Sequence, residues 1–173
     1  MDLSAQVSQF AANGQWFSTA LCLLDNECSF YWNGDTAVSD EIRFLSGSIE
    51  VPVQDADFVF ITSQDAQAEF QPESQPEDIL SRVKEGTHRD PHLSATLIIA
   101  AGGNGSDTAL LELKGPGIPP QGRRLQLSMT EAAWIKVRDR QKYEYPCGVD
   151  MIFLREDNSL FAISRKAAVT WLM

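Results

Sequence analysis

The chain has 173 residues, of which 43% are hydrophobic and 22% charged, and its formal net charge is −10. This length fits a single α/β domain over residues 1–173, and the composition is that of a globular protein that folds without a disulfide or a metal. The acidic charge disfavours nonspecific binding to nucleic acid, because that binding depends on neutralising phosphates. No apolar run reaches the ~20 residues of a membrane-spanning helix.

The cysteines and the first residues indicate the compartment. Cys22, Cys28 and Cys147 have no Cys-x-x-Cys spacing, and an odd set of this kind is typical of reduced thiols. Residues 1–12 lack the basic start and apolar core of a signal peptide. We therefore expect a cytoplasmic protein.

The first part of the chain predicts alternating helices and strands. Apolar residues recur at helical spacing over residues 16–24, and residues 28–32 form a short aromatic strand. An acidic start at Ser39 and a glycine stop at Gly47 predict a short helix. Within residues 57–62, residues 58–61 form a continuous apolar run, which is typical of a strand covered on both faces.

The next helix has the strongest local signals. Ser74-x-x-Glu77 is a capping box, in which each side chain satisfies a backbone N–H of the first turn. Pro76 lies in that first turn, where its missing N–H costs little. Gly86 is the expected stop.

The densest apolar patterning spans residues 94–118, which we interpret as the centre of the sheet. Two apolar runs, residues 95–101 and 108–113, are joined by a glycine-rich connection that is too short for a crossover helix. They should therefore pair antiparallel, which makes the sheet mixed.

The last part of the chain predicts a helix between strands. Residues 124–127 form a further strand, and Ser128-x-x-Glu131 is a second capping box that starts a helix reaching about Arg140. Residues 149–154 and 160–163 then form a hairpin.

Several motifs resemble chemical sites but lack a required part. Residues 102–105 have neither the Gly-Lys-Ser/Thr of a phosphate loop nor the following helix of a dinucleotide loop, which favours a plain hairpin turn. His88 and His92 have a spacing that suits two metal ligands on a helix, but Pro91 disfavours that helix and no third ligand is evident. No metal site is predicted. No Gly-x-Ser-x-Gly elbow of a serine hydrolase occurs.

Two residues near the start of the next strand leave alternatives open. Cys147 lies between Pro146 and Gly148, where a thiol nucleophile could sit, although a buried structural cysteine is the commoner explanation. Asp150 must reach solvent or find donors, because a buried carboxylate is costly without them. It could cap a backbone turn or hold a cationic group.

The most constrained loop is Gly115-Pro116-Gly117-Ile118, which leaves the second apolar run and leads to Arg123 and Arg124. The loop is rigid and carries backbone amides. It could receive an anion, or it could be a stiff docking loop for another protein. The residues alone do not choose between these two roles.

The order and spacing of the motifs identify a family. Taken together and in order, the motifs given below make the sequence resemble the H subunit of the bacterial carbon–phosphorus lyase system. The resemblance is close from about residue 81 to the end and weaker over residues 19–63. The motifs are Gly86-Thr87, Pro91, Ala95-Thr96-Leu97-Ile98, Leu111-x-Leu113-x-Gly115-Pro116-Gly117-Ile118, Pro146-x-Gly148-Val149-Asp150 and Arg165.

The resemblance implies a three-layer α/β/α domain with a mixed sheet, similar to the major domain of the pyridoxal-phosphate-dependent transferases but without that cofactor. It implies a homodimer in isolation and a non-catalytic subunit of a core assembly with the G, I and J proteins. That assembly degrades organophosphonates and couples phosphonate to a nucleoside triphosphate, whereas the radical cleavage belongs to the J protein. The alternative that the residues leave open is a stand-alone anion- or phosphonate-binding protein or enzyme.

The sequence departs from the family pattern at both ends. The family usually opens with a Phe-Arg pair and a Ser-x-Pro-Gly turn, which residues 1–15 do not contain, so we expect a shortened N-terminus, from either a true loss or a late start. At the other end, Ser164-Arg165-Lys166 replaces the usual Pro-Arg. The candidate binding or docking residues are Gly115, Pro116, Gly117, Ile118, Arg123, Arg124, Pro146, Gly148, Asp150 and Arg165; no catalytic residue is predicted.

Overall fold

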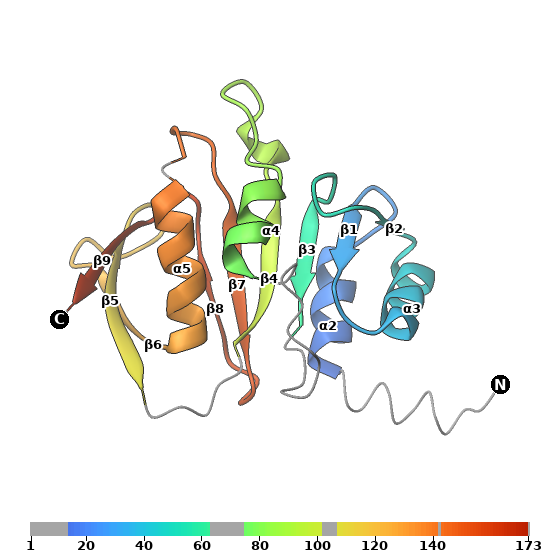
Figure 1. The fold of residues 1–173 in the computed structure, drawn as a ribbon, viewed down its shortest axis with the longest axis horizontal. Helices are drawn as coiled ribbons and strands as arrows, with labels where there is room; N and C mark the ends of the chain where they lie inside the picture. The colour runs from blue at the N-terminus through green and yellow to red at the C-terminus, as the bar shows by residue number, and fades with distance from the viewer. Residues whose placement is uncertain (1–13, 63–74, 102–106, 142, 173) are drawn as a thin grey trace.

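The computed structural model describes residues 14–62, 75–101, 107–141 and 143–172, in which helices and strands alternate (Figure 1). None of these helices is long and apolar enough to cross a membrane. In chain order the elements are α2 (Gly14–Leu23), β1 (Ser29–Trp32), α3 (Thr36–Ser46), β2 (Ile49–Glu50), β3 (Phe58–Ile61), α4 (Pro76–Arg82), the 3-10 turn η2 (Pro91–Leu93), β4 (Thr96–Ala101), β5 (Thr108–Lys114), β6 (Arg123–Ser128), α5 (Met129–Gln141), β7 (Asp150–Arg155), β8 (Leu160–Ile163) and β9 (Ala168–Leu172).

The larger sheet has six strands in the order β2-β1-β3-β4-β7-β8. The first five are parallel to one another, and β8 runs antiparallel to β7. The fold is therefore α/β with a mixed sheet, as predicted. The antiparallel member is the β7–β8 hairpin, which the sequence also predicts.

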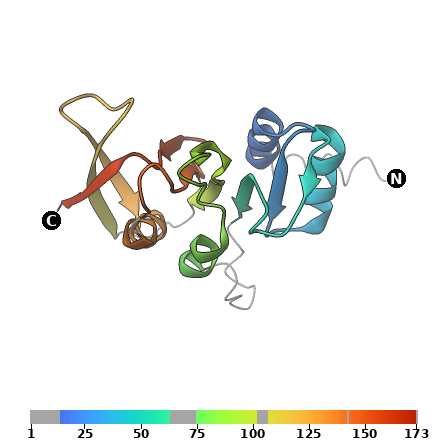
Figure 2. The same cartoon turned by 90° about the horizontal axis from the view of Figure 1, so that it is seen from above.

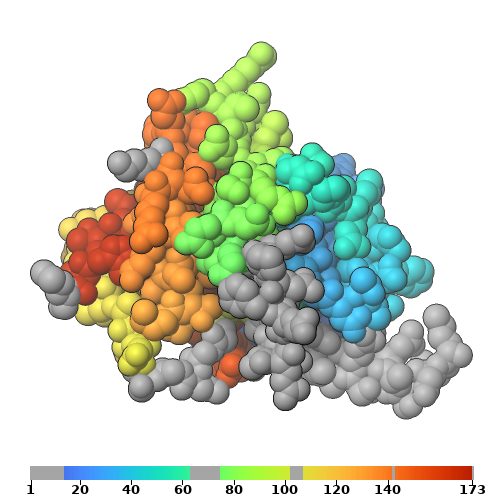
Figure 3. Space-filling model, in the orientation of Figure 1, coloured from blue at the N-terminus to red at the C-terminus, as the bar shows by residue number. Residues whose placement is uncertain are grey.

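Helices cover both faces of this sheet, because its inner strands carry apolar side chains on both sides. Val59 belongs to the core under α4 and α5, whereas the next residue, Phe60, belongs to the core under α2 and α3. Figure 2 shows α4 and α5 on one side of the sheet and α2 on the other. In the space-filling view, α4 and α5 lie side by side on the face turned toward the viewer (Figure 3).

The smaller sheet has three antiparallel strands in the order β6-β5-β9 and lies beside α5 at the C-terminal end of the molecule (Figure 1). Leu111 and Leu127 of this sheet are buried in the same core cluster as Met151 and Phe153 of the larger sheet. The two sheets therefore share one apolar core.

The predicted pairing of residues 95–101 with residues 108–113 is wrong. β4 lies between β3 and β7 and is parallel to both, so each of its edges already has a partner. β5 instead pairs with β6 and β9 in the smaller sheet. Residues 94–118 thus contribute the centre of one sheet and the centre of another. The predicted hairpin turn at residues 102–105 lies outside the described residues, although the strands beside it do not pair.

Two helix boundaries also differ from the prediction. α3 begins at Thr36 rather than at Ser39, because the Asp35 carboxylate accepts the Ala37 N–H at 2.9 Å and caps the helix there. α4 ends at Arg82 rather than at Gly86, since the chain already leaves the helix at Val83. Gly47 does end α3, in the left-handed conformation expected of a C-terminal glycine.

The two predicted capping boxes have different outcomes. Ser74 lies outside the described residues, and the residue that flanks the start of α4 is Gln75, whose side chain makes no capping bond. The second box is confirmed. The Ser128 N–H donates to Glu131 Oε2 at 2.7 Å, and the Glu131 N–H donates to Ser128 Oγ at 3.3 Å. Strands β2 and β9, each at one edge of its sheet, were not predicted.

Candidate functional site

A hollow of about 430 Å3, which we call the edge groove, lies between β8 of the larger sheet and the smaller sheet. Strands β5 and β6 supply one wall, the loop after β5 a second, and β8 with the turn after it a third. In Figure 2 that loop extends on the side of the molecule away from α4 and α5. The lining residues are Leu113, Arg123 and Leu125, then Pro116, Gly117, Ile118 and Pro119, and finally Leu160, Phe161, Ala162, Ser164 and Ala167.

The loop that lines the groove is built from two tight turns. The Ile118 N–H donates to the Gly115 carbonyl oxygen at 3.1 Å, with Pro116 and Gly117 between them. Gly117 has a φ of +78°, as the third residue of a type II turn requires. The Gly122 N–H closes the next turn at 2.8 Å from the carbonyl oxygen of Pro119. Because the turns use these amides and the prolines have none, the loop offers few donors to an anion.

The predicted site residues of this loop are only partly brought together. Pro116, Gly117, Ile118 and Arg123 line the groove. Gly115 does not line it but packs against its far wall, since a Cβ atom there would lie 3.1 Å from the backbone of residues 166 and 167.

Arg124 lies outside the groove. Its Nε is 3.9 Å from Glu112 Oε2, and its side chain is exposed. Successive side chains of a strand point to opposite faces, so Arg123 and Arg124 diverge on β6.

The remaining predicted residues form a second cluster, which we call the Arg165 anchor, beside the start of β7. Asp150 Oδ1 accepts the backbone N–H of Arg165 at 2.7 Å, and Asp150 Oδ2 is 3.8 Å from the Arg165 guanidinium. That guanidinium also donates to the Pro91 carbonyl oxygen and to Ser94 Oγ. Asp150 therefore both caps a turn and holds a cation, which are the two structural roles that the sequence left open.

The other two predicted residues lie in the segment just before β7. Gly148 is buried against Tyr143, whose ring would lie 3.3 Å from a Cβ atom at that position. Pro146 follows Tyr145 through a cis peptide bond. Cys147 is half-buried, and its N–H donates to the Glu144 carbonyl oxygen at 2.7 Å.

Sequence reasoning missed a buried arginine that connects these regions. Arg138 Nη2 donates to the Ser164 carbonyl oxygen at 2.8 Å, and its Nη1 lies 3.4 Å from Asp139. Burial lowers the pKa of the Arg138 guanidinium and raises that of the Asp139 carboxyl. Nothing in the sequence distinguishes Arg138 from the exposed Arg140 except its place on the apolar side of α5.

Tyr143 carries the most perturbed group near the anchor. Burial, and then the negative charge of Glu85, raises the pKa of its hydroxyl to about 12. The hydroxyl is buried without a hydrogen-bond partner among the described residues. It therefore stays protonated at neutral pH and packs as an aromatic side chain.

The two clusters meet at residues 164–167. Ser164 and Ala167 line the groove, whereas Arg165 between them holds the anchor. Arg123 is the one charged side chain among the groove's lining residues. In the part of the chain that the structure describes, no three His, Cys, Asp or Glu residues are grouped so that they could hold a metal ion.

The chain was compared with known proteins. The family model described as bacterial phosphonate metabolism protein (PhnH) matches residues 2–170. This range contains both the edge groove and the Arg165 anchor. No curated protein matches the sequence.

Proposed function

The chain belongs to the bacterial phosphonate metabolism protein (PhnH) family, and we propose that it works as a non-catalytic subunit of the carbon–phosphorus lyase core. As a member of this family it takes part in phosphonate metabolism. The proposed role is to support the coupling of phosphonate to a nucleoside triphosphate in a cytoplasmic assembly with the G, I and J proteins. The observation that carries the proposal is the family match over residues 2–170.

The geometry of the edge groove supports docking rather than chemistry as this role. Its walls are mainly apolar, and its loop is stiffened by two turns that use their own amides. A rigid apolar surface of this kind loses little conformational entropy when a partner binds. We further propose that the chain forms a homodimer in isolation. We also propose that its fold is related to the major domain of the pyridoxal-phosphate-dependent transferases, although the chain does not use their cofactor. Five parallel strands between helices on both faces are compatible with that relationship.

Coexpression tests the proposed function directly. The chain would be produced with the G, I and J proteins, one of which carries the affinity tag, and the purified material would be sized by gel filtration. We expect this chain to elute with the other three in a fixed ratio. Its consistent absence from a complex that the other three still form would refute the proposal.

A second candidate is favoured by one observation, the position of Arg123 in the groove. A guanidinium beside apolar walls suits a small alkylphosphonate, whose charged head would pair with the cation while its alkyl part contacts the leucines. Calorimetry with methylphosphonate and with phosphate tests this candidate. Binding that Arg123→Ala abolishes and the matched Arg124→Ala retains would support a ligand site, whereas the absence of heat with the unmodified chain would exclude it.

A further inference from the structure

We propose that the edge groove takes an extended segment of a partner protein, which adds to the larger sheet as a strand beside β8 and presents a carboxylate to Arg123. This inference rests on the proposed function, because the partner is then another subunit of the core. It specifies how the subunit is recognised. The supporting observations are the free edge of β8, the apolar side chains beside it and the charge of the lining.

β8 is the terminal strand of the larger sheet, and among the described residues no strand pairs with its outer side. The hairpin bond from the Arg155 N–H to the Ser159 carbonyl oxygen, 3.0 Å long, fixes the hydrogen-bonding phase of the ladder. Hydrogen-bonded and non-hydrogen-bonded pairs alternate along an antiparallel ladder. Phe161 opposite Phe153 is then a hydrogen-bonded pair, and Leu160 and Ala162 direct their N–H and C=O groups away from β7.

This edge lacks the features that usually block pairing. Exposed edge strands are commonly protected by a charged residue, a proline or a bulge. β8 reads Leu160-Phe161-Ala162-Ile163 and contains none of these. Leu160 remains 62% exposed. The opposite edge of the sheet, β2, is only two residues long and so offers much less to pair with.

The groove beside this edge has the right chemistry for the side chains of an added strand. Such a strand would lie about 4.8 Å from β8, with every second side chain directed into the groove. Those side chains would meet Leu113, Leu125 and Ile118, which line it. Main-chain bonds would then provide affinity and the apolar wall would provide specificity, as in other cases of strand addition.

The charge of the lining selects among possible occupants. Arg123 is its one charged side chain, and no carboxylate lines the groove. A segment with a Glu or Asp between apolar residues therefore complements it, whereas a basic segment is repelled. Pairing of β8 with β8 of a second copy would bring two copies of Arg123 to one interface without a carboxylate between them. The geometry thus favours a different protein over a second copy of this chain.

The first experiment measures binding of a fluorescent peptide of roughly six residues, the length of a typical strand. It alternates valine and threonine around a central glutamate, and a second peptide carries lysine in its place. Ala162→Pro removes an outward N–H without touching the β7–β8 ladder, and Ala162→Ser is the matched control that keeps it. We expect Ala162→Pro to weaken binding of the glutamate peptide at least about tenfold, with Ala162→Ser unchanged.

Charge reversal gives an independent measure. Arg123→Glu should exchange the preference from the glutamate to the lysine peptide, and Arg124→Glu on the opposite face of β6 should not. Equal affinity of Ala162→Pro and Ala162→Ser would overturn the inference, as would no binding of either peptide by the unmodified chain. Loss of a dimer in Ala162→Pro, seen by gel filtration, would assign the edge to a second copy and also overturn it.

The coexpression assay separates this inference from the proposed function. If the unmodified chain does not copurify with the G, I and J proteins, the proposed function fails. The peptide measurements alone then decide whether the groove binds an added strand. If the unmodified chain copurifies and Ala162→Pro copurifies equally well, the proposed function stands and the strand-addition inference fails.

Discussion

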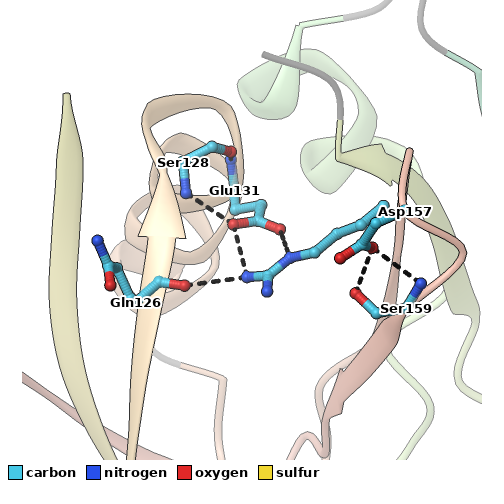
Figure 4. A network of polar contacts seen from close by, with 6 residues as sticks. Gln126, Ser128, Glu131, Asp157 and Ser159 are labelled. Atoms are coloured by element: carbon cyan, nitrogen blue, oxygen red, sulfur yellow. Dashed lines mark hydrogen bonds and ion pairs between the residues drawn. The ribbon is translucent and has the colours of Figure 1, made fainter. Parts of the chain in front are cut away.

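Replacing Glu131 by glutamine should lower the free energy of unfolding by about 3 kcal/mol. The Glu131 side chain is 1% exposed. Its carboxylate accepts the Ser128 N–H at 2.7 Å, Arg155 Nε at 2.7 Å and Arg155 Nη2 at 3.1 Å (Figure 4). Arg155 Nη2 also donates to the Gln126 carbonyl oxygen at 3.0 Å. This pair joins the start of α5 and the end of β6 to the end of β7, so it holds the two sheets together.

The magnitude follows from what each substitution leaves behind. Glu131→Gln keeps the size of the side chain, but its NH2 group cannot accept, so at least one donor loses its partner and the Arg155 cation loses its counter-charge. Breaking a buried ion pair by removing one partner costs about 3–5 kcal/mol. Arg155 is 34% exposed and regains some hydration, which places Glu131→Gln at the lower end. Arg155→Met should cost more, because it leaves the buried carboxylate of Glu131 without its cation.

Urea unfolding followed by tryptophan fluorescence measures both variants, since Trp134 on α5 is buried. The control is Arg43→Ala, which removes an ion pair with Asp40 whose side chains are 55% and 64% exposed. Exposed pairs contribute about 0.2–1 kcal/mol at most. If Glu131→Gln lowered the midpoint no more than Arg43→Ala, the pair would not hold the sheets together. A smaller loss for Arg155→Met than for Glu131→Gln would contradict the reasoning that the buried carboxylate depends on its cation.

Three further predictions use the same unfolding and binding assays. Burial acts to raise the pKa of Asp57. Hydrogen bonds to its carboxylate, of which the one from Lys84 at 2.5 Å has the largest effect, outweigh the burial and lower the pKa overall. The stabilisation that the Asp57 carboxylate contributes is then fully present above the unfolded pKa of about 3.9 and is lost as the pH falls through the lower folded pKa. The difference in free energy of unfolding between the unmodified chain and Asp57→Asn should therefore vanish in acid. A difference that is undiminished at about pH 2 would contradict this prediction. Gly115→Ala should destabilise by about 1–3 kcal/mol and more than Gly117→Ala, because only at Gly115 would the new Cβ press on backbone at 3.1 Å; equal losses would rule out that contact. Arg165→Met should lower the affinity of the chain for the glutamate peptide, although Arg165 does not line the groove, because the anchor holds the segment that does. An unchanged affinity would show that the anchor does not position the groove.

Much of the fold was predictable because local patterns determine it. The capping box at Ser128 and Glu131 fixes the start of α5 through bonds within one turn of helix. The hairpin of β7 and β8 is also local, since its strands are neighbours in sequence. The pairing of β4 was not predictable in this way, because both of its partners, β3 and β7, are distant in sequence. A short connection argues for a hairpin only when the first strand has a free edge, and β4 has none.

The candidate site was predictable to a similar extent. The turn that ends at Ile118 could be read from its Pro-Gly order, and it does line the groove together with Arg123. The choice between Arg123 and Arg124 depends on which residue of β6 faces the groove, and a shift of one residue reverses that choice. The free edge of β8 could not be read from sequence, because whether a strand is terminal depends on the order of the whole sheet.

Residues 164–167 explain why motifs far apart in the sequence lie close together, since this segment connects the edge groove to the Arg165 anchor. Gly115 permits close approach because its missing side chain leaves room for the backbone of residues 166 and 167. Gly148 does the same on the other side, where a Cβ atom would lie 3.4 Å from the Arg165 side chain. Asp150 then fixes Arg165 by its backbone N–H. The two glycines and the aspartate therefore act on one short segment, and that segment follows β8, the terminal strand of the larger sheet. Motifs that resemble separate binding elements in the sequence together hold one short segment, and this segment follows the strand edge that we propose as a docking site.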